Sequence, residues 1–112
     1  MSICVVIPAY KAALTIERAL TSVAAQTLKP EKVIVVDDGS GDGTLEIAEA
    51  FKDQFHGIEM KILSQKNLGA GAARNRAIDE ATGEWLAFLD ADDEWYPEKL
   101  AISMDSIYKH NI

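Results

Sequence analysis

The sequence predicts a doubly wound α/β fold, with a mainly parallel sheet of about four strands and helices on both of its faces. Two observations support this prediction. Four short apolar runs alternate with four helical patterns, which indicates βαβ crossovers and a parallel sheet. The runs are rich in β-branched residues and nearly continuous, as is typical of strands that are covered on both faces. The runs are 3–7, 32–36, 58–63 and 85–89.

The first run leads into a predicted helix. Pro8 stops the run, and a helix begins at about Leu14 because apolar residues recur at i, i+3, i+4 and i+7. These residues are Ile16, Ala19, Leu20 and Val23. The helix has to end before Pro30, since the residue that precedes a proline avoids the helical region.

The second run leads through the turn 39–43 into a second predicted helix. Ser40 or Asp42 can cap this helix, and Gly57 ends it. Its predicted inner face consists of Thr44, Ile47, Ala48, Phe51 and Phe55.

The third and fourth runs complete the alternation. After the loop 64–69 we expect a helix with a face of mostly small residues, which lets it pack close to the sheet, and Gly83 ends that helix. This face consists of Ala70, Ala73, Ala77, Ile78 and Ala81. After the fourth run, Pro97 suits the first turn of a last helix. The inward residues of that last helix are Leu100, Met104 and Ile107.

Length and composition indicate one compact domain over residues 1–112. The net charge of −7 disfavours nonspecific binding to nucleic acid, which needs a basic surface. No apolar stretch approaches the ~18 residues of a transmembrane segment, and the N-terminus lacks a secretory signal, so we expect a cytoplasmic protein. Cys4 is the only cysteine, which excludes an intramolecular disulfide, and its apolar neighbours predict that it is buried.

Acidic residues follow two of the four predicted strands. In open parallel sheets, ligands bind beyond the carboxyl ends of the strands. The run 90–93 contains three carboxylates in four positions, which makes it a candidate site for a divalent cation. The alternative is a solvated acidic turn that caps the next helix. Asp37 and Asp38 can accept hydrogen bonds from a base or a ribose, or they can cap the helix that follows them.

Two further residues near strand ends suit a nucleotide. Tyr10 offers an aromatic face on which a base can stack, and its alternative is a half-buried loop position. Arg74 lies near the start of the alanine-rich helix, where a cation and the helix N-terminus both favour phosphate. Its alternative is a salt bridge to one of the acids. Arg76 should point elsewhere on the helix and is the weaker candidate.

Several familiar motifs do not fit this sequence. The segment 69–74 has only two of the three glycines of a dinucleotide-binding fingerprint, and it does not open the first helix. The turn 39–43 lacks the Gly-Lys-Ser/Thr ending of a P-loop. The acid cluster is similar to the nucleophile motif of haloacid-dehalogenase phosphatases, but that motif ends the first strand of its domain. His56 and His110 have no partners at zinc-binding spacing.

Five segments, in this order, resemble the N-terminal half of family-two glycosyltransferases, which have the GT-A fold. The resemblance covers essentially the whole chain. The segments are VVIPAY (5–10), AAQT (24–27), VVDDGS (35–40) with Asp42 and Thr44, NLGAGAARN (67–75), and GEWLAFLDADD (83–93) with Pro97.

The resemblance implies a site for a nucleotide-sugar donor, most commonly a UDP-sugar. Pro8, Ala9 and Tyr10 match the loop that cradles the nucleotide base. Asp38 matches the acid that binds the base, usually uracil, and Arg74 matches the family arginine beside the nucleotide.

The resemblance also implies a cation. Asp90, Ala91 and Asp92 match the Asp-x-Asp signature, whose Mg²⁺ or Mn²⁺ bridges the donor diphosphate. Asp92 is the better candidate for direct coordination, with Asp90 beside it. Lys11 stands where many relatives have asparagine, a departure that does not disturb base stacking.

The implied reaction transfers a sugar, with inversion, to a hydroxyl of a saccharide or lipid-linked acceptor in bacterial polysaccharide synthesis. In the family the catalytic base lies well downstream of the Asp-x-Asp signature, so none is expected within these 112 residues. We therefore expect either a piece of a longer enzyme or a short relative, inactive alone, with the intact protein peripheral at the cytoplasmic face of the membrane.

Two alternatives remain open. The chain can be a non-catalytic nucleotide-binding or assembly module, since apolar surface left uncovered by a missing half favours oligomers. It can also be a phosphatase or nucleotidyltransferase that uses the same acids.

Overall fold

The computed structural model describes residues 2–110 and contains one four-stranded sheet. The strands are β1 (Ile3–Ala9), β2 (Lys32–Asp37), β3 (Glu59–Ser64) and β4 (Trp85–Phe88). Their order in the sheet is β3-β2-β1-β4, and every neighbouring pair is parallel. The predicted α/β fold with a parallel sheet is therefore confirmed.

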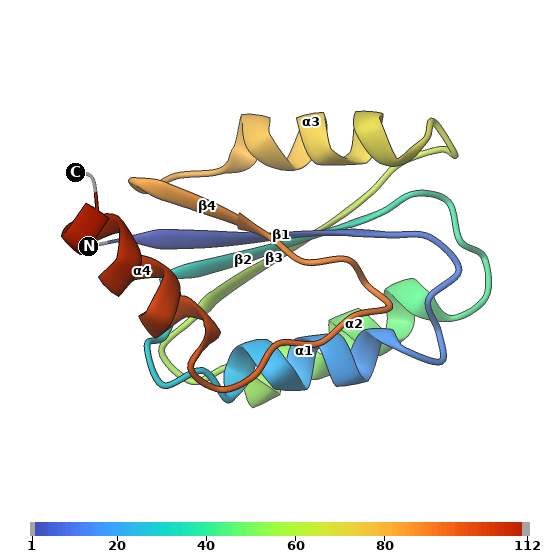
Figure 1. The fold of residues 1–112 in the computed structure, drawn as a ribbon. Helices are drawn as coiled ribbons and strands as arrows, with labels where there is room; N and C mark the ends of the chain where they lie inside the picture. Colours follow the sequence, from blue (N-terminus) through green and yellow to red (C-terminus); the bar gives the residue numbers. More distant parts are fainter. Residues whose placement is uncertain (1, 111–112) are drawn as a thin grey trace.

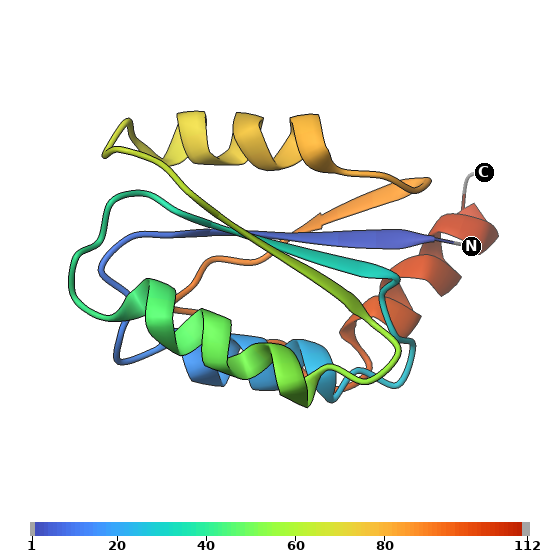
Figure 2. The same cartoon turned by 180° about the vertical axis from the view of Figure 1, so that it is seen from behind.

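Helices cover both faces of this sheet, as predicted (Figure 1). Helix α3 (Ala70–Glu80) lies on one face, and α1 (Ile16–Ala24) and α2 (Thr44–Phe51) lie on the other. Helix α4 (Lys99–His110) lies at the end of the sheet where β1 begins, as both views show (Figures 1 and 2). No helix within residues 2–110 is long and apolar enough to cross a membrane.

Four helix boundaries differ from the predicted ones. Helix α1 begins at Ile16, and Leu14 before it is fully exposed. Helix α2 ends at Phe51, and one 3-10 turn (Lys52–Gln54) follows it. Phe55 still reaches the core, because it packs edge-on against Phe51 with ring centroids 5.2 Å apart. Helix α3 ends at Glu80, before Ala81 and Gly83, and α4 begins at Lys99, two residues after Pro97.

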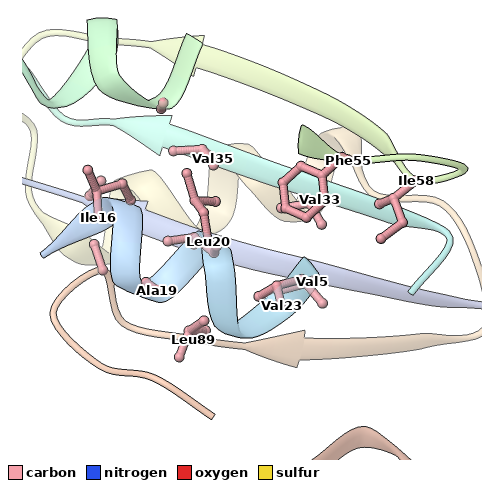
Figure 3. Close-up of a cluster of buried hydrophobic side chains, with 14 of the residues drawn as sticks. Val5, Ile16, Ala19, Leu20, Val23, Val33, Val35, Phe55, Ile58 and Leu89 are labelled. Atoms are coloured by element: carbon pink, nitrogen blue, oxygen red, sulfur yellow. The ribbon is translucent and has the colours of Figure 1, made fainter. Parts of the chain in front are cut away.

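The core has a large side and a small side. On the side of α1 and α2, branched residues of β1 and β2 pack against Ile16, Leu20 and Val23 (Figure 3). On the side of α3, the sheet meets Ala73 and Ala77, so the predicted small-residue face is confirmed at these two positions. Ile78 was expected on that face but is 40% exposed. Cys4 is buried there as predicted, and burial raises the pKa of its thiol.

The prediction that all four strands are covered on both faces is wrong for β4. Its register with β1 pairs Leu86 with Cys4 and Phe88 with Val6, which puts both apolar side chains on the face of α3. Helix α3 packs over β1 and β2 and leaves this strand uncovered. Leu86 and Phe88 are therefore 42% and 47% exposed.

Candidate functional site

One open pocket of about 680 Å³ lies beyond the carboxyl ends of β1, β2 and β4. It is bounded by the loops that follow these strands and by the first turns of α3. Eight of the residues that the sequence singled out line this pocket, whereas Asp37 and Asp93, which it also singled out, do not. The eight are Pro8, Ala9, Tyr10, Asp38, Arg74, Asp90, Ala91 and Asp92. Segments 80 residues apart in the chain therefore meet where an open parallel sheet binds its ligands.

The loop after β1 is held in place by side chains of the turn after β2. The Ser40 hydroxyl accepts a hydrogen bond from the backbone N–H of Lys11 at 2.8 Å and donates one to Asp37 Oδ1 at 2.5 Å. The Thr44 hydroxyl accepts from the backbone N–H of Ala12 at 2.9 Å. These hydrogen bonds lie within the protein, so they hold the backbone next to Tyr10 in place without a bound ligand.

Of the two residues proposed to cap α2, only Asp42 contacts the helix. Its Oδ1 accepts from the backbone N–H of Thr44 at 3.1 Å and from the Thr44 hydroxyl at 2.6 Å. The bond to the Thr44 hydroxyl is the main reason that the pKa of Asp42 is lowered. Ser40 does not cap the helix, because its hydroxyl is occupied by the loop after β1.

Asp38 is buried, and its carboxylate holds the loop between β3 and α3. Its Oδ1 accepts from Gln65 Nε2 at 2.8 Å and from the backbone N–H of Leu68 at 2.9 Å. Its Oδ2 accepts from the backbone N–H of Gly69 at 3.0 Å. These hydrogen bonds, the one from Gln65 above all, lower the pKa of Asp38.

Gly39 allows the two loops to approach each other this closely. Its φ is +72°, and a Cβ at this position would lie 2.9 Å from the backbone nitrogen of Asn67. A side chain here would push the loop after β3 away from Asp38.

Tyr10 presents an accessible ring at the mouth of the pocket. It is 47% exposed, and the Lys11 ammonium lies 5.5 Å from the ring centroid. Lys11 itself has φ +50°, a left-handed conformation that asparagine adopts more readily than lysine. This conformation would favour the asparagine that the resemblance described above led us to expect at this position.

Arg74 contributes an exposed guanidinium to the pocket. It has no hydrogen-bond or ion-pair partner within residues 2–110, so the salt bridge considered as its alternative role is not formed. Arg76 points elsewhere, as predicted, and donates to the carbonyl of Ser64 at 2.6 Å.

The acidic run after β4 is arranged differently from the one after β2. Ala91 is buried, whereas Asp90 and Asp92 are exposed and line the pocket. Neither carboxylate accepts a hydrogen bond from another residue of the described chain. Exposed, unshared carboxylates are the oxygen ligands that hard divalent cations take.

These two carboxylates do not form a complete metal site. No group of three or more histidine, cysteine, aspartate or glutamate side chains within residues 2–110 is placed to hold a metal ion. Magnesium is commonly bound by one or two carboxylates together with substrate phosphates. The donor set therefore fits a cation that is held jointly with a bound phosphate.

Sequence reasoning missed the part that Gln26 plays. Its side chain is fully buried and joins α1 to the segment that follows the acidic run. Gln26 lies three residues after Val23 and so continues the buried stripe of α1 with a polar side chain. A polar residue at an expected core position is the signal that could have identified it.

A family model described as "Glycosyl transferase family 2" matches residues 4–112. Among curated proteins, the amylovoran biosynthesis glycosyltransferase AmsB of Erwinia amylovora is 40% identical over 108 residues. The match covers 96% of this chain and 36% of AmsB. The chain thus spans about a third of the length of this relative.

Two solved structures have the same fold over nearly the whole chain. S. aureus TarS 1–349 in complex with UDP matches with a TM-score of 0.86 and 33% identity, over 98% of this chain and 33% of that one. The mannosyltransferase PcManGT of Pyrobaculum calidifontis, in complex with GDP-Man and Mn²⁺, matches with a TM-score of 0.86 and 28% identity. That match covers 94% of this chain and 32% of PcManGT.

Proposed function

The chain belongs to glycosyl transferase family 2, and on that premise we propose that it binds a nucleoside-diphosphate sugar in the pocket beyond β1, β2 and β4. The convergence of these eight predicted residues on one pocket is the observation that carries the proposal. The UDP bound to TarS and the GDP-Man bound to PcManGT support this class of ligand. A UDP-sugar is the donor that we expect first.

The end of the pocket near Tyr10 and Asp38 is proposed to receive the base. The exposed ring of Tyr10 offers a stacking surface. An ionised carboxylate has about four acceptor positions, and Asp38 uses three of them within the chain. One acceptor position is left for an N–H group of a base.

The other end of the pocket is proposed to receive the diphosphate. Asp90 and Asp92 would hold Mg²⁺ or Mn²⁺, which when bound supplies Lewis-acid stabilisation of charge on the departing diphosphate. The guanidinium of Arg74, which also lines the pocket, can pair with a phosphate. The Mn²⁺ in the PcManGT complex supports a cation in this class of enzyme.

The reaction that we propose for the whole protein is transfer of the sugar to an acceptor hydroxyl, with inversion, in polysaccharide synthesis. The name of AmsB, a biosynthesis glycosyltransferase, supports this class of pathway. None of the eight pocket residues is assigned as the base that would deprotonate the acceptor. On this proposal the chain binds the donor but does not transfer sugar alone.

Calorimetry on the 112-residue chain tests the proposal. UDP, GDP and dTDP are titrated with Mn²⁺ and again with a chelator, and we expect at least one of them to bind more tightly with Mn²⁺. Absence of binding by all three to a folded sample would refute the donor site.

A non-catalytic assembly module is the second candidate, and the exposed Leu86 and Phe88 on β4 favour it. Apolar side chains on an edge strand are a common route to self-association. Light scattering over a range of concentrations separates the candidates. A concentration-dependent oligomer that binds no nucleotide would favour the assembly module, and a monomer that binds UDP would favour the donor site.

A further inference from the structure

Gln26 is a buried amide that connects two distant parts of the chain. It follows the end of α1, and its side chain is fully inaccessible to solvent. Its Nε2 donates to the carbonyl of Ser22 at 3.1 Å and to the carbonyl of Tyr96 at 2.7 Å. Its Oε1 accepts from the backbone N–H of Leu100 at 3.0 Å. One side chain thus holds Tyr96, in the segment between β4 and α4, and Leu100, in the first turn of α4.

This segment carries the pocket acids between two anchors. At its start, Leu89 is buried and its N–H donates to the carbonyl of Val6 at 3.0 Å. At its end lie the two bonds to Gln26, together with a bond from the Thr27 N–H to the carbonyl of Pro97 at 2.9 Å. Asp90 and Asp92 lie between the anchors, so their backbone depends on both.

The bond to Leu100 also completes the start of α4. The first N–H groups of a helix have no partner within the helix. Leu100 is the second residue of α4 and is buried, so its N–H needs an acceptor from elsewhere in the protein. The oxygen of Gln26 supplies that acceptor.

A second contact from α1 reaches the acidic run directly but is much weaker. Arg18 Nη2 donates to the carbonyl of Asp92 at 3.1 Å, and its Nε lies 3.6 Å from Glu94 Oε1. The side chains of Arg18 and Glu94 are more than half exposed, and exposed pairs contribute little. Arg18 therefore cannot replace the buried anchor.

We propose that Gln26 is a positioning residue for the cation-binding end of the pocket, because it holds the segment that presents Asp90 and Asp92. The proposal rests on the proposed function, since it assumes that these acids bind a cation together with a nucleoside diphosphate. It adds a residue that does not line the pocket and that touches neither the nucleotide nor the cation.

The test compares the affinity for UDP with and without Mn²⁺ in the 112-residue chain and in Gln26→Met. Methionine keeps the length of the side chain and removes its three hydrogen bonds. We expect the gain in affinity that Mn²⁺ provides to fall by about tenfold, in the range found when outer partners of metal ligands are removed. Affinity for UDP in chelator should stay within about twofold, because the base end of the pocket is untouched.

Ser22→Ala and Arg18→Met are the matched controls. The Ser22 hydroxyl is buried in α1 and bonds only within that helix, to the carbonyl of Ala19 at 2.7 Å. Ser22→Ala removes a buried hydrogen bond but keeps the bonds of Gln26 to Tyr96 and Leu100. The gain in UDP affinity with Mn²⁺ should therefore be retained. Arg18→Met should weaken that effect by about twofold or less, as expected of an exposed contact.

A second measurement needs no substitution, and it tests the role of Gln26 even if Gln26→Met does not fold. Linkage is reciprocal, so cation binding that depends on this segment must stabilise it. We expect hydrogen exchange of the Leu100 N–H to slow several-fold more with UDP and Mn²⁺ than with UDP alone.

The outcomes separate this proposal from the proposed function. Suppose that the unsubstituted chain binds UDP more tightly with Mn²⁺. If Gln26→Met then keeps the full Mn²⁺ effect, or if the exchange rate of the Leu100 N–H does not change with Mn²⁺, the role of Gln26 is refuted. The donor site is not affected by either result. If the unsubstituted chain shows no Mn²⁺-dependent binding, the cation site fails and the role of Gln26 fails with it.

Discussion

β2 and β4 are both short apolar strands that lead into acidic residues, yet the two strands have different environments. Every residue of β2 is buried, whereas three of the four residues of β4 are exposed. The acids that follow β2 are bonded within the protein, Asp37 by Ser40 and Asp38 by the loop after β3. After β4, the carboxylates of Asp90 and Asp92 accept no hydrogen bond from the described chain, and that of Asp93 accepts one only from the N–H of the adjacent Glu94.

This difference separates two roles for acidic residues at one sheet edge. Carboxylates that are already bonded, as after β2, stabilise the loops that shape the pocket. Carboxylates without partners, as after β4, contribute little to folding and remain available to a ligand. The structure therefore predicts that substitutions at the two strand ends will divide between effects on stability and effects on binding.

The largest expected difference in stability is between Asp38→Ala and Asp92→Ala. Removal of the Asp38 carboxylate leaves two backbone N–H groups and Gln65 without their acceptor, so we expect the free energy of unfolding to fall by about 2–3 kcal/mol. Asp92→Ala should change it by no more than about 0.5 kcal/mol. Urea denaturation of both variants measures the difference, and equal losses would show that the two acids do not differ as described.

A second comparison separates Gly39 from Gly41 in the turn after β2. Both have positive φ, but only at Gly39 would a Cβ press on the next loop, at 2.9 Å from Asn67 N. We expect Gly39→Ala to cost about 2 kcal/mol or more and Gly41→Ala about 1 kcal/mol, since left-handed strain is common to both. Thermal or urea unfolding measures both costs. Equal values would mean that the close approach of the two loops is not needed for stability.

The strands themselves should respond unequally to a polar substitution. Val36 in β2 is fully buried, so Val36→Thr places a hydroxyl among apolar groups at a cost of about 1–3 kcal/mol. Leu86→Thr in β4 should cost under about 1 kcal/mol, because the side chain is 42% exposed. Denaturation midpoints measure the two effects. A large loss at Leu86 would indicate that β4 is covered in solution.

The smallest effect that we predict is a pH dependence specific to Asp38. Its pKa is lowered from the usual 3.8 in the folded state, so the unfolded chain binds more protons and the stabilisation is present above that value. It is lost as the pH falls through the lowered pKa. The difference in stability between the unsubstituted chain and Asp38→Asn should therefore shrink as the pH falls below 3.8. A difference that stays constant with pH would contradict this account.

The sequence was sufficient to predict much of the fold and eight of the residues that line the pocket, of which Pro8, Ala9 and Ala91 were predicted only from the family resemblance. Apolar runs and helical periodicity are set by residues close together in the sequence. The binding of ligands at the carboxyl ends of strands follows from the order of the elements. The exposure of Leu86 was not predicted, because the run 85–89 has the same apolar pattern as a buried strand. Whether Leu86 is buried depends on which strands α3 covers. The bonds of Asp38 and Gln26 were not predicted either. Asp38 bonds to groups 27 to 31 residues away, and Gln26 bonds to groups 70 and 74 residues away. The sequence does not show which partners at such separations will meet.

The central claim is that the unpartnered acids after β4 bind a cation together with a nucleoside diphosphate. The most direct test titrates UDP, with and without Mn²⁺, into the chain, into Asp92→Asn and into the control Asp93→Asn. Asp93 lies next in the run but outside the pocket, and its carboxylate bonds to the N–H of Glu94. We predict that Asp92→Asn abolishes the Mn²⁺ effect on UDP affinity and that Asp93→Asn retains it. Unchanged Mn²⁺ dependence in Asp92→Asn would contradict the claim.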